Sequence, residues 1–399
     1  MTILAITSYF KGEELLRACK RQGARVLLLT ETKLQHEPWP HESIDEIFYM
    51  PNLSKLPDVI YAVAYLMRAQ MVDRIIPLDE YDVEMAAILR EHLRIPGMGI
   101  TQTKRFRDKL IMRQAAAEAG IRMPEFTQVL NYDTLRAFIA ANPAPWVLKP
   151  RLEAGAMGIK RVHDSETLWR LLDELGDQQS YRLLECFIPG DVYHVDSLTV
   201  NGETVFASVQ KYGQPPLTVS HDGGIFTTMT VPIESPEAQA LTALNPTVIA
   251  ALGLRDGATH AEYIRSHAEG EYYFLEIAAR VGGANIADLI ECATGINPWA
   301  EWGKIELALA GGEPYTLPTV NRRSGGLLVC LARQEYPDLN GYHDSEIVWR
   351  MHKKQHAGII VVSEQHERVK SLVEDYHERF VSDFMAYHPP KDHPDRPVE

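Results

Sequence analysis

The sequence predicts a mixed α/β and α+β protein, with an open parallel sheet at its N-terminus and a small β-rich unit at its C-terminus. Strand-like and helix-like segments alternate over roughly the first hundred residues, which is the pattern of an open, mostly parallel sheet. The texture changes at Thr101, and pairs of strand-like runs joined by glycine turns then follow. With 399 residues, of which 45% are hydrophobic, the chain is long enough for about two or three domains.

The N-terminal α/β unit is expected to span residues 1–104. Its strand-like runs are ILAIT, RVLLLT and RIIPL, and helical stretches from Glu13 to Gln22 and near Pro57 to Gln70 separate them. A dinucleotide site after the first strand would need the pattern GxGxxG. The sequence has Tyr9 and Gly12 there instead, so a Rossmann-type oxidoreductase is poorly supported.

The central unit is expected to span residues 105–322. The run TKRFRDKLIMRQAAAEAG predicts one amphipathic basic helix that ends at Gly120. It is followed by the strand WVLKP, a glycine loop, the strand IKRV, a helix, and the strands YRLLECF and YHVDSLTV. The runs HAEYIR and YYFLEIAARVGG flank the turn AEGE and predict two antiparallel strands.

The C-terminal unit is expected to span residues 323–388. It combines the short apolar strands GGLLVCLA and AGIIVVSE with a closing helix that starts at Glu367. Residues 389–399 are rich in proline and charge, which is typical of a disordered tail.

Composition excludes several classes of partner. The formal charge of −14 arises from acidic residues spread along the chain without a basic stripe, so we expect no nucleic acid partner. No apolar run is long enough to span a bilayer and no basic leader precedes the first apolar segment, so we expect no membrane partner. The four cysteines are far apart and form no CxxC pair, which favours a reducing, cytoplasmic setting.

The first candidate site feature is Lys149, which ends an apolar strand and precedes a small-residue loop. Gly155 and Gly158 in this loop let backbone N–H groups approach phosphate oxygens, and the lysine supplies a positive charge. A plain hairpin turn after a strand that happens to end in lysine explains this piece equally well.

The second feature is a pair of carboxylates, Glu262 and Glu276, on the two strands that flank the AEGE turn. Pairing of these strands brings both carboxylates to one face, where they repel each other unless a cation with a preference for oxygen ligands lies between them. Magnesium fits such a site. Alternatively, either glutamate points to solvent.

The third feature is Arg280, which precedes Gly282, Gly283 and a helix. Its guanidinium suits a carboxylate or an acyl phosphate, and the glycines allow a ligand to approach the backbone. A surface arginine paired with an acidic neighbour is the alternative.

The fourth feature is the segment LLECFIPGDVYHVD, which carries Glu185, His194 and Asp196. Apolar side chains there can hold a flat base while backbone groups of residues 186–188 contact its polar edge. His194 and Asp196 share a strand face and are expected to reach ribose or phosphate. Ordinary polar residues of a hairpin are the alternative.

In this order and spacing, the four features resemble the ATP-grasp superfamily of carboxylate-amine ligases. The resemblance implies an ATP-grasp fold, in which an N-terminal pre-ATP-grasp domain precedes two α+β subdomains within residues 105–322 that hold ATP between them. The spelling E-I-A-A-R followed by Gly-Gly is similar to that of bacterial L-amino acid ligases, which make dipeptides. The usual pattern is E-x-N-x-R, so Ala278 stands where an asparagine commonly supplies a further oxygen for the metal.

The resemblance also implies a role for each site residue. The residues implied in ATP binding are Lys109, Lys149, the loop residues Glu153, Gly155, Ala156, Met157 and Gly158, the hinge residues Glu185, Cys186, Phe187 and Ile188, and His194 and Asp196. Glu185 is implied to contact the exocyclic amine or the ribose of the nucleotide. Glu262 and Glu276 are implied to bind Mg²⁺, or Mn²⁺ in its place. Arg280 and Lys149 are implied to act in catalysis, and the substrate contacts implied are Arg280, Gly282, Gly283 and His221, in a second loop that could close over the site.

The activity implied is ATP-dependent joining of a carboxylate, such as that of an amino acid, to an amine. It proceeds through an acyl phosphate and releases ADP and phosphate, and the family habit implies a homodimer. Two alternatives stay open. One is a carboxylase-like enzyme or another synthetase with a substrate that is not an amino acid. The other is an ATP-binding regulator without catalysis, which Ala278 motivates.

Overall fold

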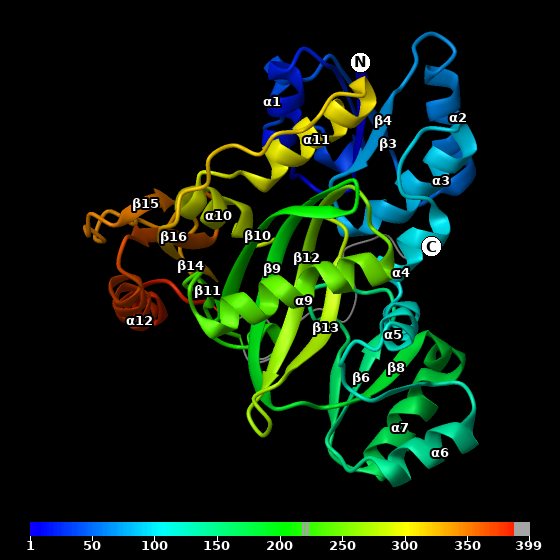
Figure 1. Ribbon diagram of the computed structural model, residues 1–399, viewed down its shortest axis with the longest axis vertical. Coiled ribbons are helices and arrows are strands. Elements are labelled where there is room, and N and C mark those ends of the chain that lie inside the picture. Colours follow the sequence, from blue (N-terminus) through cyan, green and yellow to red (C-terminus); the bar gives the residue numbers. More distant parts are fainter. Residues whose placement is uncertain (218, 220–222, 387–399) are drawn as a thin grey trace.

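A computed structural model describes residues 1–217, 219 and 223–386. These residues form three sheets (Figure 1): one in the N-terminal region, a long one through the middle of the molecule, and a small one beside it. His221 and the predicted tail at 389–399 lie outside the described residues.

The N-terminal sheet has four parallel strands in the order β3-β2-β1-β4. The predicted open parallel sheet is therefore confirmed. Its elements are β1 (Thr2–Thr7), α1 (Glu13–Arg21), β2 (Arg25–Glu31), β3 (Glu46–Met50), α2 (Leu56–Leu66), β4 (Arg74–Pro77) and α3 (Val83–Leu93). The 3₁₀ turns η1 (Thr32–Leu34), η2 (His41–Ser43) and η3 (Glu80–Asp82) connect them.

The basic helix predicted to end at Gly120 is in fact two helices, α4 (Ile100–Arg107) and α5 (Lys109–Glu118). The break lies at Asp108, whose backbone is extended and whose carboxylate accepts a hydrogen bond from the Leu110 N–H at 3.0 Å. The prediction of one helix was wrong because an aspartate that caps a helix N-terminus stabilises a new start.

The small sheet has the order β5-β8-β6-β7 and is antiparallel. Helices α6 and α7 and the 3₁₀ turn η4 belong to the same unit (Figure 1), and buried side chains from the helices and strands form one core. The elements are β5 (Phe126–Gln128), α6 (Tyr132–Ala141), β6 (Trp146–Pro150), β7 (Lys160–Val162), α7 (Ser165–Leu175), η4 (Gly176–Tyr181) and β8 (Arg182–Cys186).

The central sheet has eight antiparallel strands in the order β13-β12-β9-β10-β11-β14-β16-β15. Its strands are β9 (Gly190–Val200), β10 (Glu203–Tyr212), β11 (Phe226–Thr230), β12 (Gly257–Ser266), β13 (Tyr272–Ala278), β14 (Ser324–Leu331), β15 (Ile347–Arg350) and β16 (His356–Ser363). The helices of this region are α9 (Pro236–Leu252), α10 (Ile286–Thr294), α11 (Pro298–Gly311) and α12 (His366–Asp383). The strands of the predicted C-terminal unit thus continue the central sheet, because β14 pairs with β11.

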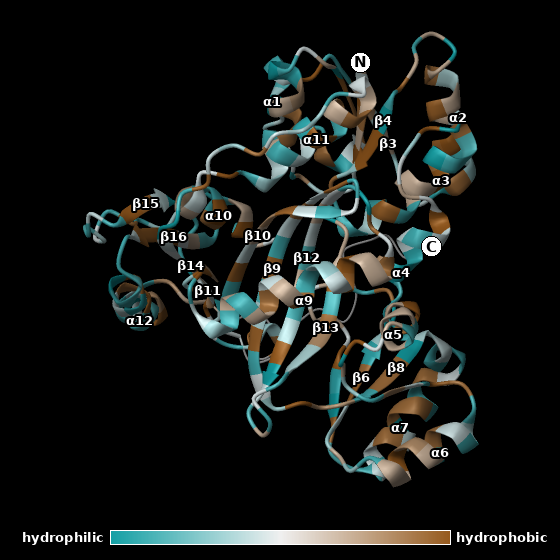
Figure 2. Ribbon diagram, viewed as in Figure 1, coloured by the Kyte–Doolittle hydropathy of each residue, from teal (hydrophilic) through white to brown (hydrophobic). Residues whose placement is uncertain are grey.

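Packing holds the N-terminal sheet against the rest of the molecule. A buried cluster contains Leu15 and Cys19 of α1 together with Trp302 and Ile305 of α11. The helices approach closely at Gly303, where an added Cβ would lie 2.9 Å from the Cys19 sulfur. Figure 2 shows hydrophobic residues along strands of the N-terminal sheet and along parts of α6 and α7. Within the described ranges, no helix combines the length and hydrophobicity needed to cross a membrane.

Candidate active site

A cavity of about 500 Å³ is lined by residues of the small sheet and of the central sheet. It is lined by residues of β6, β8, β12 and β13, by the loop after β6, and by Glu80 and Arg107 from the N-terminal region and α4. The residues predicted for the site that line it are Lys109, Lys149, Glu153, Gly155, Ala156, Glu185, Cys186, Phe187, Ile188, Glu262, Glu276, Arg280 and Gly283. The fold therefore brings most of the predicted site to one place.

Lys149 is buried at the end of β6 and pairs with Glu185 of β8. The Lys149 Nζ lies 2.5 Å from one carboxylate oxygen of Glu185, and the Nε of Arg113 in α5 lies 2.6 Å from the other. Burial lowers the pKa of Lys149, against the attraction of the carboxylate. Burial alone would raise the pKa of Glu185, but the charges of Arg113 and Lys149 lower it. Glu185 is thus an ionised carboxylate between two cations.

This geometry changes the interpretation of Glu185. The sequence predicts that it contacts the exocyclic amine or the ribose of a nucleotide. Both of its oxygens are instead occupied by cations, and its side chain is only 2% exposed. Because a buried carboxylate needs such partners, we assign Glu185 to positioning Lys149.

Lys109 connects the glycine loop to the carboxylate pair. Its Nζ donates to the Glu153 carbonyl at 2.6 Å and lies 3.3 Å from a carboxylate oxygen of Glu276. The loop itself has positive φ at Gly155, Ala156 and Gly158. Successive N–H groups in such turns can form a concave site for anions, so the loop and both lysines could hold phosphates. Met157 and Gly158 belong to the loop but do not line the cavity.

Glu262 and Glu276 lie directly opposite each other in the β12–β13 pairing. The predicted hairpin is confirmed, and both side chains line the cavity. Burial raises the pKa of Glu276, but the charges of Lys109 and Lys149 outweigh it and lower the pKa to about 2. Two carboxylates that face one cavity are a donor set suited to a hard divalent cation. Ala278 also lines the cavity and offers no side-chain oxygen.

Arg280 is held by a carboxylate from the N-terminal region. Its Nε donates to Glu80 at 3.0 Å, and the other Glu80 oxygen accepts from Arg107 at 2.8 Å. Glu80 follows β4 in η3 and is 6% exposed. Neither Glu80 nor Arg107 was predicted from the sequence, although the end of a parallel strand is a common place for ligand contacts and could have indicated Glu80.

Two of the backbone groups predicted to contact the base are already used within the protein. The N–H groups of Cys186 and Phe187 donate to the carbonyls of Glu125 and Pro145, at 2.8 and 3.1 Å. They are therefore not the donors that read the edge of a base. All three residues of the segment still line the cavity.

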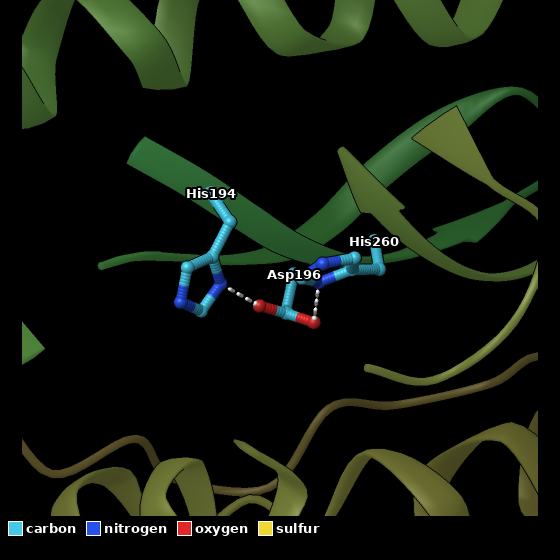
Figure 3. A group of neighbouring side chains, drawn as sticks. All are labelled: His194, Asp196 and His260. Atoms are coloured by element: carbon cyan, nitrogen blue, oxygen red, sulfur yellow. Dashed lines mark hydrogen bonds and ion pairs between the residues drawn. The ribbon is translucent and has the colours of Figure 1, made fainter. Parts of the chain in front are cut away.

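His194 and Asp196 lie on the correct face of the sheet but do not line the cavity. Figure 3 shows Asp196 between His194 and His260. Its two oxygens lie 2.7 Å from His194 Nδ1 and 2.9 Å from His260 Nδ1, and His194 Nε2 lies 2.8 Å from the Thr228 hydroxyl.

The predicted contact of His194 and Asp196 with ribose or phosphate does not fit this arrangement. The ring of Tyr212 covers His194 at a centroid distance of 4.5 Å. Gly282 covers Asp196, because an added Cβ there would lie 2.5 Å from its Oδ1. Gly282 itself therefore packs against the sheet and does not line the cavity.

Burial and hydrogen bonding set the charges of this group. Burial lowers the pKa of His194. Burial also lowers the pKa of His260, but the Asp196 carboxylate outweighs it and raises the pKa to about 10. The ligand atoms of His194, Asp196 and His260 lie within 4.8 Å of one another, close enough to hold a metal ion. The observed separations are those of hydrogen bonds, so the group forms a hydrogen-bonded network.

Known proteins resemble the part of the chain that supplies most of the residues of this cavity. Residues 142–288 match the ATP-grasp domain. The chain is 26% identical over 263 residues to an L-arginine-specific L-amino acid ligase of Bacillus subtilis, an alignment that covers 64% of this chain and 62% of that protein. The chain thus spans about three fifths of the length of this curated relative.

Solved structures support the same fold. An L-amino acid ligase from Bacillus licheniformis superposes with a TM-score of 0.75 at 17% identity, over 97% of this chain and 99% of that one. The biotin carboxylase domain of the Hydrogenobacter thermophilus 2-oxoglutarate carboxylase, in complex with MgADP and bicarbonate, superposes with a TM-score of 0.71 at 16% identity, over 93% and 88%. The predicted ATP-grasp fold is therefore confirmed.

Proposed function

We propose that this chain, which has the ATP-grasp fold, is an ATP-dependent carboxylate-amine ligase that uses an amino acid as a substrate. One observation carries the proposal: the cavity places two lysines, two opposed carboxylates and an arginine around one space. These are the groups that phosphoryl transfer to a carboxylate needs, because its transition state carries negative charge that cations offset.

The proposed nucleotide site uses Lys109, Lys149 and the loop around Gly155 for the phosphates. Glu262 and Glu276 would hold Mg²⁺, and their fit rests on the opposed carboxylates that face the cavity. When bound, the metal would screen the charge of the phosphate oxygens. The MgADP complex of the Hydrogenobacter domain, which has the same fold, supports this assignment.

In the proposed reaction, an oxygen of the substrate carboxylate attacks the γ-phosphorus of ATP. The bond from this phosphorus to the β,γ-bridging oxygen breaks, and the products are an acyl phosphate and ADP. The amine then attacks the acyl carbon, inorganic phosphate leaves with the electron pair of the C–O bond, and the amine nitrogen loses a proton. Lys149 and Arg280 offset charge on the transferring group.

Arg280 is prepared for this role by Glu80. The Glu80 carboxylate fixes the Nε of Arg280, and the Arg280 Nη1 donates to the Val281 carbonyl at 2.8 Å. A guanidinium oriented in advance loses less conformational entropy when it binds an anion. The amino acid substrate is supported by the similarity to the Bacillus subtilis ligase and by the E-I-A-A-R spelling.

A carboxylase-like synthetase is the second candidate. It is favoured by the shared fold with the Hydrogenobacter domain, which was solved with bicarbonate. In that case bicarbonate replaces the amino acid carboxylate as the group that receives phosphate.

The proposal includes a reducing, cytoplasmic setting. All four cysteines of the chain, Cys19, Cys186, Cys292 and Cys330, are free thiols, as is usual in reducing compartments.

The test is release of phosphate from Mg-ATP by the purified protein with amino acids, alone and in pairs, and with bicarbonate. We expect ADP and phosphate to appear only with particular amino acid pairs. Glu276→Ala should abolish release, whereas Glu271→Ala, in the turn of the same hairpin and with its side chain 58% exposed, should not. Turnover with bicarbonate alone would favour the carboxylase-like enzyme, and nucleotide binding without turnover would favour the regulator.

A further inference from the structure

We infer that Asp196 is a positioning residue for the metal site, acting through His260 and Tyr212 on Glu262. This inference rests on the proposed function, because it takes Glu262 to be a metal ligand. Asp196 and His194 do not line the cavity, and nothing in the proposed reaction otherwise uses them.

The register of three strands places this network beside the carboxylate pair on the same sheet. Asp196 of β9 lies opposite His260 of β12, and His194 lies opposite Glu262. Glu262 in turn lies opposite Glu276 of β13. All five side chains therefore belong to one face of the central sheet, because directly opposed residues share a face.

A chain of contacts leads from Asp196 to Glu262. Asp196 Oδ1 lies 2.9 Å from His260 Nδ1. On the other side of the ring, His260 Nε2 lies 3.3 Å from the Tyr212 hydroxyl and 3.6 Å from Glu262 Oε1. The Tyr212 hydroxyl donates to the same Glu262 oxygen at 2.9 Å. Asp196 thus sets the orientation of the imidazole, and the imidazole and the phenol together fix one oxygen of Glu262.

The far side of the network is anchored as well. The second oxygen of Asp196 lies 2.7 Å from His194 Nδ1, and His194 Nε2 lies 2.8 Å from the Thr228 hydroxyl on β11. Figure 3 shows the carboxylate between the two imidazoles. Since Asp196 is 3% exposed and His194 is fully buried, water does not compete for these hydrogen bonds.

The same carboxylate also supports the loop that follows Arg280. A Cβ added at Gly282 would lie 2.5 Å from Asp196 Oδ1 and 3.1 Å from His260 Nδ1. The backbone at Gly282 therefore rests on the Asp196–His260 pair. One buried carboxylate thereby positions both a proposed metal ligand and the segment next to the proposed catalytic arginine.

Groups that hold a metal ligand in place commonly contribute 10- to 100-fold to metal affinity. Asp196→Asn keeps the size of the side chain but presents an amide N–H₂ to one of the two imidazoles. We therefore expect the affinity for Mn²⁺ in the presence of ADP, measured by electron paramagnetic resonance, to fall by roughly 10- to 100-fold. Binding of ADP without metal should stay the same, because the lysines and the glycine loop are unchanged.

The matched control is Asp191→Asn on the same strand. Asp191 is a carboxylate whose side chain is 43% exposed and which pairs with Lys211, so its change should leave Mn²⁺ affinity unaltered. Tyr212→Phe removes only the hydroxyl that contacts Glu262 and provides a second test should Asp196→Asn fold poorly. It should also weaken Mn²⁺ binding while ADP binding persists.

Unchanged Mn²⁺ affinity in folded Asp196→Asn would overturn the inference. If Asp196→Asn does not fold, unchanged Mn²⁺ affinity in Tyr212→Phe would overturn it instead. A metal ion that stays bound to the nucleotide-free protein and is lost in Asp196→Asn would also overturn it, because the network would then be a metal site of its own. Absence of any Mn²⁺–ADP binding by the unaltered protein would instead show that the proposed nucleotide site is wrong, and this inference with it. None of these binding measurements depends on turnover of an amino acid.

Discussion

Replacement of Arg113 by methionine tests how the buried charges beneath the cavity are held. Arg113 is fully buried, and its Nε pairs with Glu185 at 2.6 Å. Methionine fills the same space with an apolar side chain, and the Glu185 carboxylate is left with Lys149 as its remaining cation. Removal of one partner from a buried pair typically costs about 3–5 kcal/mol of unfolding free energy.

The structure favours the lower end of this range. Glu185 keeps its contact with Lys149 at 2.5 Å. In addition, Nη1 and Nη2 of Arg113 are buried and have no hydrogen-bond partner among the described residues, so their loss removes an existing cost. We expect a loss of about 3 kcal/mol. For a domain of 150–250 residues this corresponds to a decrease of about 6–12 °C in melting temperature.

The assay is thermal unfolding of Arg113→Met beside Arg136→Met. Arg136 is also a helical arginine paired with a carboxylate, Asp133, at 2.9 Å, but the two side chains are 61% and 90% exposed. An exposed pair of this kind contributes less than about 1 kcal/mol, so Arg136→Met should melt close to the unaltered protein. If both variants lose the same small amount, the argument that Arg113 is required to bury the Glu185 charge is refuted.

Three further predictions concern the cavity. The pKa of Glu276 is lowered to about 2 from an ordinary value of 4.5, so its ionised form stabilises the fold above pH 4.5 and this stability is lost as the pH falls toward 2. Glu276→Gln should therefore flatten the dependence of the melting temperature on pH between these values. An unchanged slope would contradict this prediction. Cys186 lines the cavity whereas Cys19 is buried, so mass spectrometry after iodoacetamide treatment should find Cys186 labelled without nucleotide and unlabelled with Mg-ADP. Cys19 should be unlabelled in both cases. Equal labelling of Cys186 with and without Mg-ADP would place the base elsewhere. Glu80→Gln should reduce phosphate release at least about tenfold with little change in ADP affinity, because a neutral amide orients Arg280 less firmly than a charged partner; equal loss of both would indicate a general structural role.

The sequence by itself determined the parts of the site that local rules control. Glu262 and Glu276 flank a short turn, and a hairpin with such a turn fixes which residues lie opposite each other. Lys149 lies at the end of an apolar strand, and a small-residue loop with Gly155 and Gly158 follows, so its place beside a loop could be predicted from the order of residues. The alternation of strands and helices similarly predicted the N-terminal parallel sheet.

Only the tertiary structure decided which distant residues complete the site. Glu80 reaches Arg280 across 200 positions of sequence, and Arg113 reaches Glu185 across 72. Periodicity placed His194 and Asp196 on one strand face, but it could not show that Tyr212 and Gly282 cover them. The physical reason is that a strand's own pattern fixes only the side to which its residues point, whereas neighbouring strands and loops from other parts of the chain decide whether those residues meet a ligand or each other.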